Sequence, residues 1–575
     1  MKNIIVSVLV LLLASGMVFA GGNQAAGGGG ASAKAPTAVI SGLPLTKDDV
    51  TFTVFIGGGT KDWISSFDYK DNAFTKKVTD ETGIKFEFIV TSAADHAERR
   101  NVMLSTGTYP DIIISRNGMT LGDIDYYAQQ GIIIPLDDYN PLGYPNIKAA
   151  FDEVPAINQK VRGSDGKLYS LPEVNECVHC VFGNGRVWYY KPWARDGYGN
   201  KVPTTTAELL EYLRYVKTHD MNGNGNPNDE IGIAFSKNSI DNFILYFSKP
   251  FMPIITSNWG FGIARENGKV VEQYRDNRFR DALRYIRSLY QEGLIAPNSF
   301  SMTDDELKSL IQATTPVVAL PAVAWINGFT TQPSERWIDY FSLTPIAGPS
   351  GQRYGGNSEQ SSIVVPFYFV TSKCKRPDLA VALYNYFIDW EVSQYGLLGP
   401  KGIAWDDPEP GALGVTGKPA LYRQLVGYGS SPLNTSWDQD AIPSIRVARL
   451  YYHAMQAKGA EEAQKWIATG DTSLREYLLN LPDYAEEMWY YTAKGHQDYA
   501  VPDSYFVPLF ALSESDTTRL SDINASLNPY REQALVEFIT GVRDINSDAA
   551  WRTYLSELDR FGGKDKTDIL QKYIK

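Results

Sequence analysis

Alternating apolar and polar residues mark the strands in the first part of the chain. Residues 51–56 and 84–90 alternate in this way, which is typical of strands with one buried face. A helix with its own apolar stripe is expected between them, ending at Gly83. A second helix, 93–105, leads to a short apolar strand at 110–114. This order of strand and helix predicts an α/β architecture with a mostly parallel sheet.

Apolar residues at helical spacing predict further helices in the rest of the chain. Thr205 and Glu208 form a capping box, in which a hydroxyl and a carboxylate satisfy the free amides of a new helix. Two tryptophans in such patterns, Trp390 and Trp551, are assigned to the core. The other expected helices cover residues 279–289, 378–395, 530–540 and 551–558.

The first residues have the pattern of a secretory signal peptide. Lys2 precedes an apolar run at 4–13, and the small residue Ala20 is followed by glycine. We expect residues 1–20 to be removed and the protein to act in the periplasm or outside the cell. Residues 21–45 are rich in glycine and alanine, and we expect them to form a flexible leader.

Composition and charge narrow the possible partners. The chain has 575 residues and a net charge of −12, and it has no cluster of basic residues. Nucleic acids and anionic membrane surfaces are therefore not expected as partners. The chain has 35 Tyr, 25 Phe and 12 Trp. Many of these aromatic residues belong to the core, and a surplus is what a sugar- or peptide-binding cleft would need.

The cysteines do not form a disulfide scaffold, because the chain has only three of them. Cys177 and Cys180 have the spacing of a redox or metal motif, but a zinc site would need a second pair. They form either a local disulfide or two inert thiols, and Cys374 then has no partner.

One loop has the spacing of a calcium site. Oxygen-bearing side chains alternate along it and acids close it, as in an EF-hand loop, but the glutamate stands at position 11 instead of 12. Either the loop holds a structural calcium ion, or it is a polar turn without an ion. The candidate ligands are Asp220, Asn222, Asn224, Asn226, Asn228, Asp229 and Glu230.

The chain lacks the common enzyme motifs. It has no G-x-S-x-G elbow, no H-E-x-x-H pair and no P-loop. Its five histidines show no ligand spacing. We therefore do not expect an enzyme, although a pair of acids distant in the sequence remains open as a glycosidase site.

Several segments in a fixed order resemble the extracellular solute-binding proteins of ABC importers. The resemblance is to the branch that carries oligosaccharides and includes the alginate-binding and LipO-like proteins. Many members have a cysteine after the signal peptide, whereas Gly21 stands here, so no lipid anchor is implied. The segments are 82–84, 109–112, 131–139, 165–172, 203–209, 220–230, 267–270 and 538–541 followed by Trp551.

The resemblance implies a two-lobed periplasmic-binding-protein fold of type II, with hinge segments that cross between α/β lobes and a cleft between them. It also implies a calcium ion, a monomer, an oligosaccharide ligand and permease subunits as partners. The crossings are expected near 171–181, 354–362 and 425–440. Lobe 1 then comprises residues 46–175 and 355–430, and lobe 2 comprises 176–354 and 431–575.

Aromatic residues in loops are the candidates for sugar contact, because their rings cover the C–H faces of a sugar while polar groups bind its hydroxyls. Trp259 and Trp405 resemble positions that line the family's cleft. For every ring the alternative is packing in the core. The candidates are the rings of Trp63, Trp188, Tyr189, Trp259, Trp325, Trp405 and Trp437, together with Asn357, a polar side chain of the expected hinge that could face the cleft.

Three functions are compatible with these features. The first is a binding protein that delivers an oligosaccharide to an importer. The second is an exported glycan hydrolase or lyase, and the third is a carbohydrate sensor that serves no transporter. An enzyme would need positioned acid and base groups in the cleft, whereas a binding protein needs only stacking and hydrogen bonds.

Overall fold

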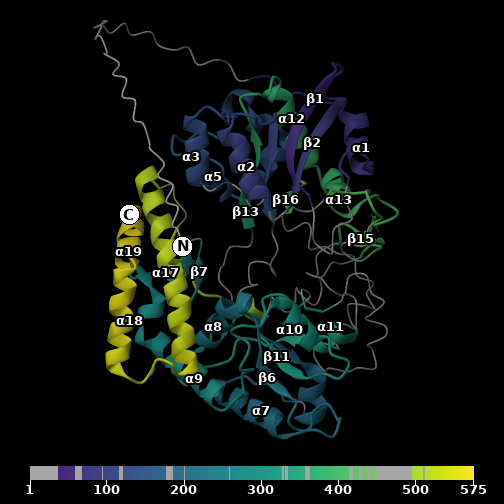
Figure 1. Cartoon of the computed structure of the whole chain (residues 1–575). Coiled ribbons are helices and arrows are strands. Elements are labelled where there is room, and N and C mark those ends of the chain that lie inside the picture. Colours follow the sequence, from purple (N-terminus) through teal and green to yellow (C-terminus); the bar gives the residue numbers. More distant parts are fainter. Residues whose placement is uncertain are drawn as a thin grey trace, which may run out of the picture.

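The structure is a computed structural model that shows two α/β lobes, one above the other in Figure 1. Within the described residues, no helix has both the length and the hydrophobicity needed to cross a membrane. The description covers residues 37–574 without 59–67, 93–94, 116–118, 120, 176–184, 200, 258, 327–328, 331–334, 356–362, 413–418, 427–431, 438–441, 444, 447–494, 509 and 511.

A six-stranded sheet forms the centre of the first lobe, in the order β16-β4-β13-β3-β1-β2. β13 is antiparallel to both of its neighbours, and the other five strands run in one direction. The sheet is therefore mostly parallel, as the sequence predicts. Its strands are β1 (Val50–Gly58), β2 (Ile84–Ser92), β3 (Ile112–Ile114), β4 (Leu171–Asn175), β13 (Ile363–Val370) and β16 (Ile445–Arg446).

Helices cover both faces of this sheet, because alternate residues of β1 enter two separate cores. Val54 and Ile56 pack in one core, and Phe55 packs in the other with Ile113 and Phe369. The helices are α1 (Ala73–Thr82), α2 (His96–Ser105), α3 (Leu121–Gln129), α4 (Pro145–Glu153), α5 (Ile157–Lys160), α12 (Pro377–Phe387) and α13 (Trp390–Leu398), and a small hairpin joins β14 (Trp405–Asp406) to β15 (Arg423–Gln424).

Capping residues set the ends of these helices. Gly83 ends α1 in the left-handed conformation, at φ 76°, as predicted from its position after the apolar stripe. The prediction of a single helix over 378–395 is wrong, because the chain forms the two helices α12 and α13 there. Asp389 separates the two helices, since its carboxylate accepts the amide N–H groups of Glu391 and Val392 at 3.1 and 3.4 Å.

The second lobe contains short sheets. β5 (Trp188–Tyr190) pairs antiparallel with β12 (Tyr340–Ser342), and β6 (Ile231–Ala234) pairs parallel with β11 (Val318–Pro321). Two hairpins follow, β7–β8 (Thr256–Ser257, Gly260–Phe261) and β9–β10 (Ile263–Glu266, Lys269–Glu272). The helices are α7 (Thr206–Thr218), α8 (Ile240–Ser248), α9 (Asn277–Gln291), α10 (Asp304–Ile311) and α11 (Glu335–Asp339).

Three C-terminal helices lie along one side of the second lobe, drawn in yellow in Figure 1: α17 (Glu514–Thr540), α18 (Asp548–Arg560) and α19 (Gly563–Gln571). Arg280 of α9 attaches them, donating to the carbonyl of Ile545 at 2.9 Å and to Asp548 at 2.7 Å. Trp551 lies in this core, as predicted. α17 also contacts α3 of the first lobe, so this side of the molecule joins the two lobes.

The flexible leader expected to reach residue 45 ends earlier. Thr37 donates its amide to the carbonyl of Asp138 at 3.1 Å, and Ile40 donates to the hydroxyl of Tyr144 at 3.2 Å. Leu45 packs against the core of the first lobe. Residues 37–45 are therefore held on this lobe, while the predicted signal peptide lies outside the described residues.

The lobe boundary expected at 430 differs from the structure. Trp437 and Ile442 belong to the core of the first lobe, and β16 pairs with β4 of its sheet. The described residues between 432 and 446 therefore remain in the first lobe, and the third crossing expected at 425–440 is wrong. The chain also passes between the lobes between Asn175 and Gly185 and between Gly355 and Ile363.

Candidate functional site

One edge of the first-lobe sheet faces the second lobe. The chain leaves the first lobe after β4, so the carboxyl end of β4 marks this edge. β1, β2 and β3 run parallel to β4 and end at the same edge, at Gly58, Ser92 and Ile114. Open α/β sheets bind ligands outside the carboxyl ends of their strands. This edge is therefore the half of a candidate cleft that the first lobe supplies.

His96 organises a polar cluster at this edge. It is the first residue of α2, and its two ring nitrogens share hydrogen bonds with the hydroxyls of Thr91 and Ser115, both at 2.8 Å. Its ring lies against Phe55, with 4.6 Å between centroids. No motif in the sequence singles out His96, which is one of the five histidines without ligand spacing. Its place at a helix start just after a strand is the signal that would have identified it.

In the second lobe, the carboxyl ends of two strands lie at the edge where the chain enters from the first lobe. The indole N–H of Trp188 donates to the carbonyl of Val323 at 2.9 Å, and Tyr340 donates its hydroxyl to the carbonyl of Val318 at 2.9 Å. β11 therefore ends beside the start of β5, where the chain enters from the first lobe. β6 is parallel to β11 and ends at the same edge.

Trp325 follows β11 at this edge and is partly exposed. The guanidinium carbon of Arg186 lies 4.8 Å from the centroid of its ring. Asn242 holds the backbone beneath: its Oδ1 accepts the amides of Gly185 and Arg186 at 2.9 and 3.1 Å, and its Nδ2 donates to the carbonyl of Arg186 at 2.8 Å.

Three basic side chains gather behind this edge. Burial lowers the pKa of Arg186 to about 9. Burial, and then the charge of Arg186, lower the pKa of Lys249 to about 7. Burial and these two cations hold the pKa of His496 well below its ordinary value. His496 shares a hydrogen bond of 3.1 Å with the hydroxyl of Ser342. All three side chains are buried, so they lie behind the cleft edge and are not exposed on it.

Trp259 lies in a separate aromatic stack beside the C-terminal helices. It is partly exposed, its ring stacks on Phe510 at 4.8 Å, and its N–H donates to the carbonyl of Pro508 at 3.1 Å. Phe510 in turn stacks on Tyr573 at 5.1 Å. One face of Trp259 is therefore occupied, and the exposed remainder of its indole is available for contact.

Four of the predicted ligand-binding residues are core residues in this structure. Trp188, Tyr189, Trp405 and Trp437 are 0, 8, 2 and 2% exposed, so no ring face of theirs is open to a sugar. The indole N–H groups of the three tryptophans are satisfied internally: Trp188 donates to Val323, Trp405 to Gly399 and Trp437 to Thr75, at 2.9, 2.9 and 2.8 Å. Trp63, Asn357 and the cysteine pair at 177 and 180 lie outside the described residues, and Cys374 is a buried free thiol.

The loop between α7 and β6 folds around Asp220. The carboxylate of Asp220 accepts the amides of Gly223, Asn224 and Gly225 at 2.8, 3.1 and 2.7 Å. Asp229 accepts the side-chain amide of Asn224 at 2.6 Å. The loop thus brings Asp220, Asn224 and Asp229 together.

The end of the loop turns back to its beginning. Oε1 of Glu230 accepts the amide of Met221 at 2.8 Å, and its Oε2 is buried without a hydrogen-bond partner. Asn228 instead donates its amide to the side chain of Asn226 at 3.2 Å. Within the described residues no three His, Cys, Asp or Glu side chains gather to hold a metal ion, so an ion in this loop would also need the asparagine oxygens.

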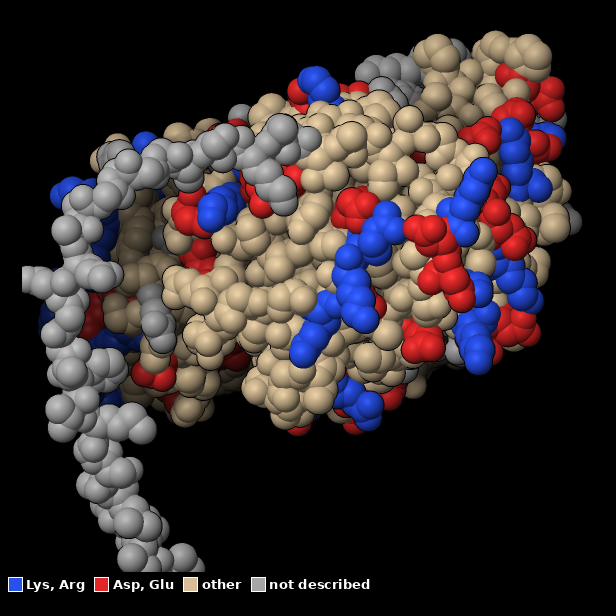
Figure 2. Space-filling view, turned by 90° about the horizontal axis from the view of Figure 1, so that it is seen from above, with Lys and Arg blue, Asp and Glu red and all other residues tan. Residues whose placement is uncertain are grey.

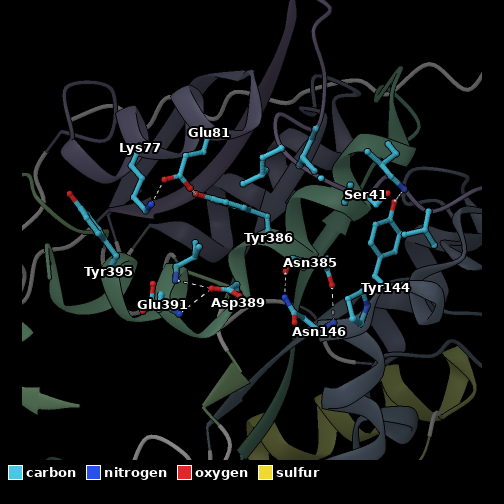
Figure 3. A pocket seen from close by; sticks show the side chains of 18 of the residues that line it. Ser41, Lys77, Glu81, Tyr144, Asn146, Asn385, Tyr386, Asp389, Glu391 and Tyr395 are labelled. Carbon is cyan, nitrogen blue, oxygen red and sulfur yellow. Dashed lines mark hydrogen bonds and ion pairs between the residues drawn. The ribbon is translucent and has the colours of Figure 1, made fainter. Parts of the chain in front are cut away.

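The first lobe has a cavity of about 740 Å³, shown in Figure 3. It lies between residues 39–45, α1, α12 and α13, and only residues of the first lobe line it. Its polar groups pair with one another: Tyr386 donates to Glu81 at 2.6 Å, and Asn146 donates to the carbonyl of Asn385 at 3.0 Å. The cavity is therefore distinct from the edges that face each other between the lobes.

Charges of both signs lie on the molecular surface. On the face seen in Figure 2, basic and acidic side chains are interspersed, and the net charge of the chain is −12.

Comparisons with known proteins agree with this architecture, although no protein-family model matches the chain. The chain is 24% identical over 521 residues to the fructooligosaccharide ABC transporter substrate-binding protein FusA of Streptococcus pneumoniae, covering 89% of this chain and 88% of FusA. The structure of FusA with kestose superposes with a TM-score of 0.66 at 22% identity, covering 91% of this chain and 98% of FusA. A second FusA structure, an EF-hand mutant with fructo-nystose, has the same TM-score of 0.66.

Two further solved structures share the fold. An oligosaccharide (HMO)-binding solute-binding protein of Bifidobacterium longum infantis has a TM-score of 0.71 at 18% identity, covering 92% of this chain and 98% of its own. The alginate-binding protein AlgQ2, solved without calcium ion, has a TM-score of 0.60 at 17% identity with the same coverage. The sequence match to FusA and the shared two-lobed fold thus show that this chain is similar to solute-binding proteins of ABC transporters.

Proposed function

We propose that this protein is the substrate-binding component of an ABC importer, which captures an oligosaccharide between its lobes and delivers it to the permease subunits. The observation that carries the proposal is the pair of facing sheet edges, with the polar cluster of His96 on one and the partly exposed Trp325 on the other. Closure of two lobes on a ligand is a hinge motion, and the closed form is what the permease would recognise.

The groups at the two edges suit a sugar. Trp325 offers an indole for the C–H face of a sugar ring. Thr91, Ser115 and His96 are buried and bonded to one another, so they hold the opposite edge in place. A buried sugar hydroxyl without a partner costs about 1–3 kcal/mol, so the polar groups that reach the cleft decide which sugar is accepted. Trp259, Trp63 and Asn357 remain further candidates for ligand contact.

The proposed function is tested with purified protein and a panel of kestose, fructo-nystose and alginate oligosaccharides. We expect at least one sugar to raise the melting temperature, because a ligand that binds the folded state stabilises it by mass action, without any product detected by chromatography. Turnover would establish the glycan-active enzyme instead. A sugar that binds but does not stimulate the ATPase of the reconstituted importer would favour a sensor. Binding of no panel sugar would contradict the carbohydrate assignment.

We further propose that the loop 220–230 holds a structural calcium ion. Calcium prefers six to eight oxygen ligands, and the buried Oε2 of Glu230 and the carboxylates of Asp220 and Asp229 supply hard oxygens that the asparagines complete. Asp229 and Glu230 are better candidates than Asn228, because both turn back to the start of the loop. The names of two relatives mention an EF-hand and a calcium ion.

Removal of calcium should destabilise the protein. An ion present at about 100 times its dissociation constant stabilises the folded state by about 2.7 kcal/mol, so we expect excess chelator to lower the melting temperature by about 5 °C. Asp220→Ala should abolish this response to the chelator. Asn228→Ala is the matched control and should retain it, because Asn228 bonds only to Asn226. An unchanged melting temperature in chelator would reject the calcium site.

We also propose that the protein acts outside the cytoplasm after residues 1–20 are removed. The mass of the exported protein measures this directly. A mature chain that starts at Gly21 is the expected result, and a mass that retains residues 1–20 would overturn it.

A further inference from the structure

We infer that two buried residues of the second lobe, Arg186 and Trp188, are positioning residues that hold Trp325 as a rigid stacking surface for the ligand. The inference rests on the proposed function, because it concerns the same cleft. The sequence allows either ligand contact or core packing for Trp188, and the structure buries it and bonds its N–H to the carbonyl of Val323.

Trp188 fixes the segment that carries Trp325. Its indole N–H donates to the carbonyl of Val323, two residues before Trp325, at 2.9 Å, and both Trp188 and Val323 are fully buried. The strand that contains Trp188 is itself held, since the amide of Leu343 donates to the carbonyl of Val187 at 2.7 Å. The chain that follows β11 is thus attached to β5 immediately before it reaches the cleft.

Arg186 fixes the ring. Its guanidinium carbon lies 4.8 Å from the centroid of the Trp325 ring, and the whole side chain is buried. The three hydrogen bonds of Asn242 to residues 185 and 186 hold its backbone. Gly185 is required here: its φ is 71°, and a Cβ would come within 2.5 Å of Nζ of Lys249. The backbone of Arg186 is therefore fixed, and its side chain is enclosed in the core beside the Trp325 ring.

A ring held in this way binds more tightly than a mobile one. An exposed tryptophan in a loop loses rotamer freedom when a sugar stacks on it, and this loss reduces affinity. Arg186 and Trp188 impose the order before the ligand arrives. Substitutions of Arg186 and Trp188 should therefore change the affinity for the ligand only when Trp325 is present. This dependence distinguishes a positioning role from a general contribution to the core.

The test is a double-mutant cycle measured by calorimetry with kestose, or with the panel sugar that binds most tightly. Trp188→Phe removes the N–H and keeps a ring, and we expect it to weaken binding about fivefold, the value of one neutral hydrogen bond. Arg186→Lys removes the planar stack and should weaken binding by about 3- to 10-fold. In a Trp325→Ala background, both changes should alter the remaining affinity by less than about twofold.

A second arginine–tryptophan pair provides the matched control. Arg280 lies over Trp551 at 5.5 Å in the core against the C-terminal helices. Arg280→Lys and Trp551→Phe should lower the melting temperature and leave the affinity of the folded protein unchanged. Wild-type affinity in Trp188→Phe and Arg186→Lys, or losses that persist in full without Trp325, would overturn the inference while the proposed function stands.

A readout without ligand keeps the two proposals separate. The fluorescence of Trp325 is the difference between the spectra of the wild type and Trp325→Phe. In the Arg186→Lys background this difference spectrum should shift to the red, because a released ring is more exposed to water. If no panel sugar binds, the proposed function fails, and an unshifted spectrum then also contradicts the positioning of Trp325 by Arg186.

Discussion

Replacement of Trp325 by alanine should weaken sugar binding about 100-fold, the effect of losing a tryptophan that dominates a binding site. Trp325 is expected to have this effect because it is partly exposed, stands at the carboxyl end of β11 and rests on the guanidinium of Arg186. Trp325→Phe keeps an aromatic face and should recover part of the lost affinity. Titration calorimetry with kestose measures both variants.

A half-buried indole of the first lobe supplies the control for this substitution. Trp390 packs against Trp405 and Tyr422, with centroids 6.5 and 5.7 Å apart, and is partly exposed like Trp325. Trp390→Ala should lower the melting temperature while the folded protein keeps its affinity. Equal losses of affinity in Trp390→Ala and Trp325→Ala would show that the losses reflect damage to the fold, and would remove Trp325 from the site.

Replacement of Trp437 by alanine should destabilise the first lobe by about 3–5 kcal/mol, the usual cost of removing a large aromatic side chain from a core. Trp437 meets Phe74 and Phe88 edge to face, at 5.2 and 5.7 Å, and donates its N–H to Thr75. Urea denaturation of Trp437→Ala measures this cost. Trp437→Phe, which keeps part of the ring volume, is measured for comparison.

The same variant tests which lobe Trp437 belongs to. In scanning calorimetry of the ligand-free protein, Trp437→Ala should lower the transition of the first lobe, and Trp551→Ala should lower that of the second. Trp437→Ala should keep the affinity of the folded protein for the sugar. A variant of nearly wild-type stability with much weaker binding would instead indicate that Trp437 contacts the ligand, the other role that the sequence allows.

Local structure follows closely from the sequence. The alternation in residues 51–56 and 84–90 corresponds to β1 and β2, and the apolar stripe ended by Gly83 corresponds to α1. These features depend on contacts only a few residues apart. The break at Asp389 also has a local cause, the capping of α13 by its carboxylate, so the sequence contains that signal even though the helix over 378–395 is predicted as continuous.

The exposure of each ring does not follow from the sequence. Trp188 and Trp325 both stand in short apolar segments, yet Trp188 is buried and Trp325 is partly exposed, because β5 lies inside the second lobe and the segment after β11 lies at its edge. The role of His96 depends in the same way on Thr91 and Ser115, which meet it only when β2 and β3 lie on either side of β1.

The sequence alone therefore determines the α/β class, the helix and strand periodicities, the spacing of the loop 220–230 and the resemblance to solute-binding proteins, since each is a pattern along the chain. The tertiary structure decides which indoles are buried and which are exposed, and where the lobes divide. β16, more than 260 residues after β4, returns to pair with β4 and brings Trp437 into the first core. Such pairing depends on the burial of apolar surface by segments distant in sequence, and no local pattern specifies which segments meet.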